Sequence, residues 1–230
     1  SFPTPSRLTV ASRESLGKHL NRLPREYSGM GRPLERRASV LLPLCHHYGV
    51  PSIVFTRRSA MLNKHPGDIC FPGGMVDEDD RSVEAAALRE LEEEVGVPGS
   101  AVETLGVLRC DWAELTAVTG VAVTPVIGFI REDLSESSLH INPSEVAAAF
   151  SVSLSDLANP RHWTRVPYHT PVFEHGGHVV WGLTAYILDR FMRKALRRTM
   201  GPDPGVIESE VRALVRSEIV RQVEHLGMGG

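Results

Sequence analysis

The chain has 230 residues, of which 42% are hydrophobic and 23% are charged, and its formal net charge at pH 7 is −3. This is the composition of an ordinary soluble globular protein, and the length permits one large domain or two small ones. No basic stripe dominates any segment, and no apolar run reaches the roughly 18 residues of a membrane-spanning helix. We therefore expect neither a nucleic-acid partner nor a membrane span.

The cysteines and the first residues bear on the compartment. Cys45, Cys70 and Cys110 are widely spaced and form no Cys-x-x-Cys pair, which argues against a zinc site or a disulfide framework and favours a reducing, intracellular compartment. Residues 1–13 contain two arginines, no acidic residue and several hydroxyl side chains. Disordered polar tails and organelle transit peptides share this composition, so both the cytoplasm and the mitochondrion stay open.

Hydrophobic periodicity and turn residues predict an α+β domain with a helical C-terminal extension. Ser12 is the expected N-cap of the first helix. In chain order we expect a helix over 12–23, strands over 38–44 and 52–56 with a turn at 46–49, a loop over 61–80, a helix over 82–96, strands over 103–109, 121–130 and 150–154, and helices over 183–199 and about 206–226. The chain is divided accordingly into a tail with a short helix (1–35), a central domain (36–200) and a C-terminal helix (201–230).

The helix over 82–96 carries the residues of greatest chemical interest. At about 100° per residue, Glu90, Glu93 and Glu94 share one narrow face, which we expect to be exposed. Leu91 and Val95 form a separate apolar stripe that can anchor the helix to a sheet. The three carboxylates repel one another on an isolated helix. They indicate either a solvated acidic face or a site for a divalent cation, and oxygen ligands of this kind suit Mg²⁺ or Mn²⁺.

Residues 73–97 resemble the signature of the Nudix family, which runs Gly, five residues, Glu, seven residues, then Arg-Glu-apolar-x-Glu-Glu-x-Gly-apolar. The segment from Arg89 to Val97 matches the second half at every specified position. In the first half Asp80 stands where the pattern has Glu, and one residue is inserted. The resemblance implies a β-α-β sandwich with a mixed sheet and flanking helices. It also implies a Mg²⁺ or Mn²⁺ requirement and hydrolysis of a nucleoside diphosphate linked to another group.

This chemistry assigns roles to four glutamates. Glu90, Glu93 and Glu94 are the expected metal ligands, where divalent ions neutralise the diphosphate and activate water for attack on phosphorus. One of these glutamates or a distant one must accept the proton of the water. Glu145 is the best distant candidate because it follows a turn and precedes an apolar run. A surface carboxylate near a strand end is an equally good interpretation of Glu145.

The segment before the signature is similar to the motif of coenzyme A diphosphatases within the Nudix family. Ser59, Gly67 and the run Phe71-Pro72-Gly73-Gly74 match that motif, whereas Asn63 stands in place of its arginine, with Lys64 beside it. The inserted residue also occurs in this subfamily. The expected substrate contacts are Arg57, Arg58, Ser59, Lys64, Gly73 and Gly74.

The resemblance implies cleavage of coenzyme A and its acyl derivatives to 3′,5′-ADP and 4′-phosphopantetheine. The alternatives are a Nudix hydrolase for another dinucleotide, such as NADH or ADP-ribose, and a Nudix-fold binding module. Binding modules of this family usually lose their metal carboxylates, and this chain keeps all of them.

Three further features receive structural interpretations. His175 and His178 can form a ligand pair, but the intervening Gly-Gly favours a hairpin turn. Trp181 is expected in the core. The amphipathic pattern over about 206–226 buries either its own domain or a partner subunit, which leaves a homodimer open.

Overall fold

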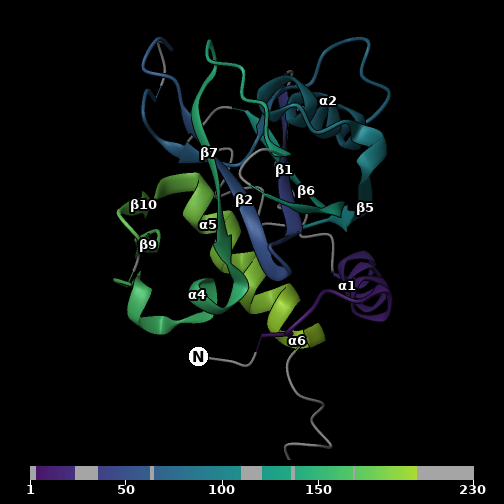
Figure 1. Ribbon diagram of the computed structural model, residues 1–230, viewed down its shortest axis with the longest axis vertical. Coiled ribbons are helices and arrows are strands. Elements are labelled where there is room, and N and C mark those ends of the chain that lie inside the picture. Colours follow the sequence, from purple (N-terminus) through teal and green to yellow (C-terminus); the bar gives the residue numbers. More distant parts are fainter. Residues whose placement is uncertain are drawn as a thin grey trace, which may run out of the picture.

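The computed structural model describes residues 4–23, 36–62, 65–109, 121–135, 138–167 and 169–200 (Figure 1). The predicted helix over 206–226 lies outside these residues, as do Asn63, Lys64 and Cys110. Within the described ranges, no helix is both long and apolar enough to cross a membrane.

A mixed sheet forms the centre of the fold. Its main path runs β3 (Ile69–Cys70), β2 (Val50–Arg58), β1 (Arg37–His47), β6 (Ala122–Leu134) and β5 (Val102–Val107). Two further strands join it, β4 (Gly73–Met75) beside β1 and β7 (Val146–Ser153) beside β2. β1 and β6 are parallel, whereas the other pairs are antiparallel. This confirms the expected α+β class with a mixed sheet.

Helices cover both faces of the sheet, because the central strands are apolar on both sides. In β1, Leu41 packs in the cluster that contains Leu91 of α2 (Val83–Val95). The next residue, Leu42, belongs to the larger cluster on the opposite face, as alternation along a strand requires. That cluster receives Leu16 and Leu20 of α1 (Val10–Arg22). It also receives the continuous helical segment of α5 (Gly182–Arg190), η4 (Phe191–Leu196) and α6 (Arg197–Met200), of which Phe191 is fully buried.

A small second sheet lies at one end of the fold. It consists of β8 (Trp163–Thr164), β9 (Val172–His175) and β10 (His178–Val180), and it follows α4 (Leu154–Ala158) and η3 (Pro160–His162). The Gly176–Gly177 turn joins β9 to β10, and both glycines have positive φ angles of 59° and 77°. The predicted hairpin at these glycines is therefore confirmed.

The structure corrects several predicted boundaries. The first helix begins at Val10, because Thr9 is its N-cap and accepts a hydrogen bond from the Ser12 backbone N–H at 3.2 Å. The predicted loop over 61–80 contains the short strands β3 and β4. Trp181 is 52% exposed rather than buried, because it precedes α5 while Val180 takes the buried position.

Candidate active site

Helix α2 is fixed at both ends and along one side. The Ser82 hydroxyl accepts a hydrogen bond from the Ala85 N–H at 3.1 Å, and Gly96 ends the helix with a left-handed φ of 72°. Leu91 and Val95 are fully buried against β1 and β2. The apolar stripe predicted from the sequence therefore anchors the helix and sets the direction of its carboxylates.

The three glutamates of α2 differ sharply in exposure. Glu94 is 5% exposed, whereas the side chain of Glu90 is 14% exposed and that of Glu93 is 50% exposed. The expectation that all three lie on an exposed face is wrong for Glu94, because β4 and the end of β2 cover it. The Gly73 N–H donates to Glu94 Oε1 at 3.4 Å, and the Thr56 hydroxyl donates to Oε2 at 3.3 Å.

Burial changes the acidity of the two inner carboxyls. Loss of hydration on burial, with a smaller contribution from the neighbouring charge of Glu90, raises the pKa of Glu94 to about 7. Burial also raises the pKa of Glu90, against the lowering effect of the Arg89 guanidinium. Both carboxylates are therefore costly to ionise without a nearby cation.

Two glycines of β4 allow this close packing. A Cβ atom added to Gly74 would collide with the Glu90 carboxylate, and one added to Gly73 would lie 2.5 Å from the Ser39 carbonyl oxygen of β1. At Gly73 only a residue without a side chain fits, because the clash is with backbone atoms, whereas a side chain at Gly74 would push the Glu90 carboxylate aside. The Gly73-Gly74 pair thus brings the backbone of β4 against the carboxylates of α2.

Arg89 organises the loop that precedes α2. Its guanidinium donates to both carboxylate oxygens of Asp80, at 3.2 and 2.9 Å, and to the Met75 carbonyl oxygen at 3.1 Å. It also donates to Glu90 and Glu93, each at 3.0 Å. These bonds lower the pKa of Asp80. Asp80, which stands where the signature has Glu, therefore pairs with Arg89 although the segment carries an inserted residue.

Glu145 lies in a turn that is tied to the same site. The Asn142 N–H donates to the Glu94 carbonyl oxygen at 3.0 Å, and the Ser59 N–H donates to the Glu145 carbonyl oxygen at 2.8 Å. The Glu145 carboxylate is close enough to Glu90 to contribute to its raised pKa. The structure thus brings Glu145 to the acidic face of α2.

Ser59 is buried, with 4% exposure, and its hydroxyl donates to the Pro143 carbonyl oxygen at 3.2 Å. Its side chain therefore holds the turn that carries Glu145.

The two arginines at the end of β2 face opposite sides of the sheet. Arg58 acts on Glu94 and lowers its pKa, on the side where Thr56 contacts the same carboxylate. Arg57 donates to His178 Nδ1 at 3.3 Å on the other side, where the His178 ring stacks on Phe150. Arg58 therefore joins the carboxylates, and Arg57 does not. His175 and His178 do not form a ligand pair, because the Nδ1 atom of His178 interacts with Arg57 instead.

The sequence left two contributors to this site without a role. Thr56 is fully buried between Glu94 and Cys70, with its hydroxyl 3.3 Å from the Cys70 sulfur. Burial raises the pKa of the Cys70 thiol. Arg89 stands at a specified position of the Nudix signature, and this position could have indicated that it belongs to the site.

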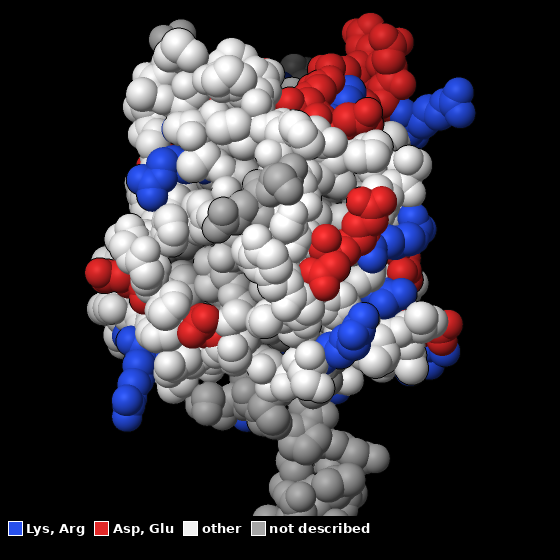
Figure 2. All heavy atoms as spheres, in the orientation of Figure 1, with Lys and Arg blue, Asp and Glu red and all other residues white. Residues whose placement is uncertain are grey.

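The donor set fits a divalent cation. Acidic side chains gather over α2 and the loop before it (Figure 2). The carboxylates of Glu90 and Glu94 lie in a glycine-lined fold of the chain, and oxygen donors without imidazole or thiolate suit Mg²⁺ or Mn²⁺. Among the described residues, however, the three glutamates do not bring their oxygens within 4.8 Å of one another. Arg89 holds Glu93 outward while Gly73 and Thr56 hold Glu94 inward.

Comparisons with known proteins agree with this arrangement. The family model for the NUDIX domain matches residues 35–173. An uncharacterized Nudix hydrolase NudL of Photorhabdus laumondii is 40% identical over 167 residues, which cover 69% of this chain and 84% of that protein. The NudL of an Escherichia coli O7:K1 strain is 42% identical over 165 residues, covering 66% and 79%. These relatives are bacterial and give no support to a mitochondrial location.

The similar solved structures are more distant in sequence. A protein of Deinococcus radiodurans has a TM-score of 0.46 at 18% identity, covering 70% of this chain and 88% of that one. The family model matches more than half of the chain, and the relatives are well above 30% identity over most of their length. The chain therefore belongs to the Nudix family and is a hydrolase that acts on the diphosphate bond of a nucleoside diphosphate-linked substrate.

Proposed function

We propose that the substrate is coenzyme A or an acyl-coenzyme A, cleaved to 3′,5′-ADP and (acyl-)4′-phosphopantetheine. The observation that carries the proposal is the segment between β2 and α2. Its subfamily-type residues Ser59 and Gly73 contact the elements that hold the catalytic carboxylates. Phe71 of the same motif stacks on Phe55 of β2, with ring centroids 5.1 Å apart. Ser59 and Gly73 thus tie the motif to the turn that carries Glu145 and to Glu94, while Phe71 packs on the opposite face of the sheet.

We assign Glu90, Glu93 and Glu94 as ligands of Mg²⁺ or Mn²⁺. When bound, such an ion supplies positive charge against the diphosphate oxygens. Arg89 positions Glu93 and Glu90 through bonds of 3.0 Å. Glu145 is our choice for the group that accepts the proton of the attacking water, because its turn is bonded to both α2 and Ser59 and the residue is partly exposed. Glu93 and Glu94 are the other candidates for that role.

The proposed substrate contacts lie on both faces of β2. We propose that Arg58 meets the diphosphate, because it lies on the side of the carboxylates. The 3′-phosphate distinguishes coenzyme A from NADH and ADP-ribose, and it is a dianion that needs cationic partners. Arg57, Lys64 and His65 are the proposed partners at the end of β2 and in the loop that follows. Gly73 and Gly74 let the substrate approach the backbone of β4.

A substrate panel tests the proposal. Values of kcat/KM are measured for coenzyme A, 3′-dephospho-coenzyme A, NADH and ADP-ribose at saturating Mg²⁺. We expect coenzyme A to have the highest value. A higher value for NADH or ADP-ribose would replace the proposed substrate while leaving the Nudix activity intact. The homodimer stays a prediction, since the predicted helix over 206–226 on which it rests lies outside the described residues. The cytoplasmic location stays a prediction as well.

A further inference from the structure

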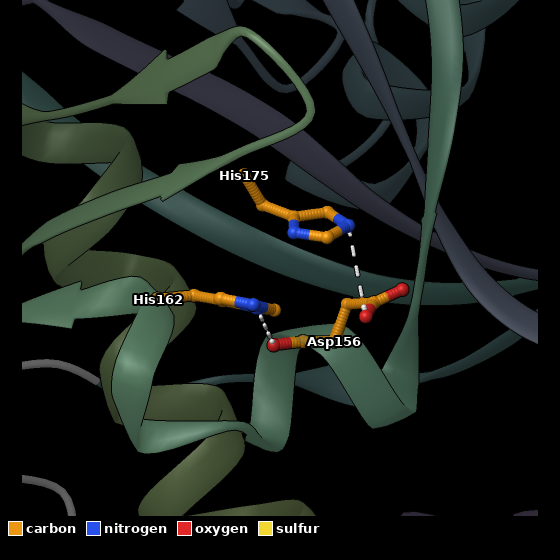
Figure 3. Close-up of side chains that lie close together, drawn as sticks. All are labelled: Asp156, His162 and His175. Carbon is orange, nitrogen blue, oxygen red and sulfur yellow. Dashed lines mark hydrogen bonds and ion pairs between the residues drawn. The ribbon is translucent and has the colours of Figure 1, made fainter.

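A second group of ligand-type side chains lies away from α2. Asp156 of α4, His162 of η3 and His175 of β9 converge on one space, as Figure 3 shows, and one ligand atom from each lies within 4.8 Å of the others. All three residues are partly buried. Figure 1 shows α2 at the upper right and α4 with the β9–β10 hairpin at the left, and their buried residues belong to the clusters on opposite faces of the sheet. This group is therefore separate from the carboxylates of the Nudix site.

The hydrogen bonds of His162 prepare one of its nitrogens for a metal. Its Nδ1 lies 3.0 Å from the Asp156 carbonyl oxygen, and a carbonyl only accepts, so Nδ1 must carry the proton. Nε2 then carries the lone pair, which accepts a long 3.4 Å hydrogen bond from the Asn159 amide nitrogen that an ion could replace. Metal-binding histidines are held in the same way, with the second ring nitrogen donating to a carbonyl or carboxylate.

The Asp156 carboxylate is also oriented by a neighbour. Its Oδ2 accepts from the Ser153 hydroxyl at 2.5 Å, while Oδ1 faces His175 Nε2 at 3.6 Å. That separation is too long for a good hydrogen bond. Ligands at roughly 2.0–2.2 Å from a tetrahedral ion stand roughly 3.3–3.5 Å apart. The spacing of Asp156 and His175 is therefore closer to that of two ligands than to that of a direct bond.

The two imidazole rings support the same interpretation. The ring centroids of His162 and His175 are 4.2 Å apart, so the two imidazoles lie side by side at the same space. Neutral imidazole is the ligand form. The side chains of Asp156 and His175 are 39% and 38% exposed, so an ion can enter from solvent.

We propose that Asp156, His162 and His175 bind a divalent transition metal, Zn²⁺ by preference, with a fourth position open to water. Two imidazole nitrogens and one carboxylate oxygen are a donor set for Zn²⁺, whereas Mg²⁺ selects oxygen ligands. Because the ligands come from α4, η3 and β9, the ion ties the β9–β10 hairpin to the end of β7. The site does not depend on the substrate of the Nudix centre.

The experiment is a calorimetric Zn²⁺ titration of the full chain, stripped of metal and then saturated with Mg²⁺ to occupy the α2 carboxylates. The variants are His162→Gln and His175→Gln, and the matched control is His169→Gln, an exposed histidine of the same region. We expect one Zn²⁺ per chain in the wild type and in His169→Gln. Each cluster variant should bind at least roughly ten-fold more weakly, since loss of a ligand exceeds the effect of losing its support.

Co²⁺ is the second probe, because its visible absorption reports the coordinating atoms. We expect a tetrahedral spectrum without a thiolate charge-transfer band, and its loss in His175→Gln. Equal Zn²⁺ affinity in all four proteins would overturn the proposal, as would a thiolate band from a cysteine site. Retained circular dichroism of the variants excludes misfolding as the cause of lost binding.

Discussion

Replacement of Glu94 by Gln is expected to stabilise the metal-free protein at pH 8 and to leave its stability nearly unchanged at about pH 4. Gln fits the same space because its Oε1 can accept from the Gly73 N–H. Its Nε2 can donate to the Thr56 hydroxyl, whose own hydrogen then turns to the Cys70 carbonyl oxygen at 3.5 Å. The substitution therefore removes a buried charge and keeps the contacts.

The magnitude follows from the shifted pKa of Glu94. Burial raises this pKa from the ordinary 4.5 to about 7, so the native state binds more protons than the unfolded chain between these values. The stability of the wild type must then fall as the pH rises through this window. At about 1.4 kcal/mol per pKa unit, the free energy of unfolding of the wild type falls by roughly 3 kcal/mol above pH 7. The Gln variant has no charge to bury and does not lose this stability.

Urea unfolding in the presence of EDTA at about pH 4 and at pH 8 measures the difference. Glu92→Gln is the control, because Glu92 is exposed on the same helix. The Glu92 carboxylate accepts a hydrogen bond from the Gly99 N–H at 3.3 Å, and the amide oxygen of Gln can accept the same bond. We expect the control to match the wild type at both pH values. A Glu94→Gln variant that is no more stable than the wild type at pH 8 would refute the reasoning that Glu94 is a costly buried charge.

Four further results are expected. Glu93→Gln and Glu94→Gln should each lose most of the turnover at saturating Mg²⁺, by orders of magnitude, and near-wild-type kcat in both would remove the metal-ligand assignment. Activity should vanish in EDTA and return with Mg²⁺ or Mn²⁺ alone, so full activity in excess chelator would contradict the metal requirement. Gly74→Ala should lower kcat at least about ten-fold, because its methyl group displaces the Glu90 carboxylate. Unchanged turnover in steady-state kinetics would show that the close packing of residue 74 on Glu90 is not needed for activity. Lys64→Ala should lower kcat/KM for coenzyme A by roughly ten- to a hundred-fold and leave 3′-dephospho-coenzyme A unaffected, since one charge-assisted bond contributes ~1.5–3 kcal/mol; equal effects on both substrates would separate Lys64 from the 3′-phosphate.

Local sequence signals predicted the central helix well. Ser82 and Gly96 marked its ends, and the spacing of Leu91 and Val95 marked its buried side. The same periodicity placed Glu94 beside Glu90 but could not show that β4 covers Glu94. That contact depends on two glycines some 20 residues earlier, whose pairing with β1 is a long-range event.

Contacts between distant segments account for the rest. The cluster of Asp156, His162 and His175 forms because the small sheet brings β9 back toward α4. The spacing of these residues in the sequence does not predict that they meet. The cysteine pattern argued against a zinc site, but that argument concerns thiolate ligands only. Trp181 shows the opposite error, since its aromatic character predicted burial while the start of α5 turned its side chain to solvent.

Product analysis is the most direct test of the proposed cleavage of coenzyme A. Metal-depleted protein is incubated with coenzyme A, Mg²⁺ is added, and the products are identified by mass spectrometry beside a Glu94→Gln sample. We predict 3′,5′-ADP and 4′-phosphopantetheine in equal amounts, formed only after Mg²⁺ is added and nearly absent in the variant. Intact coenzyme A under these conditions, in a preparation that cleaves ADP-ribose or NADH, would contradict it.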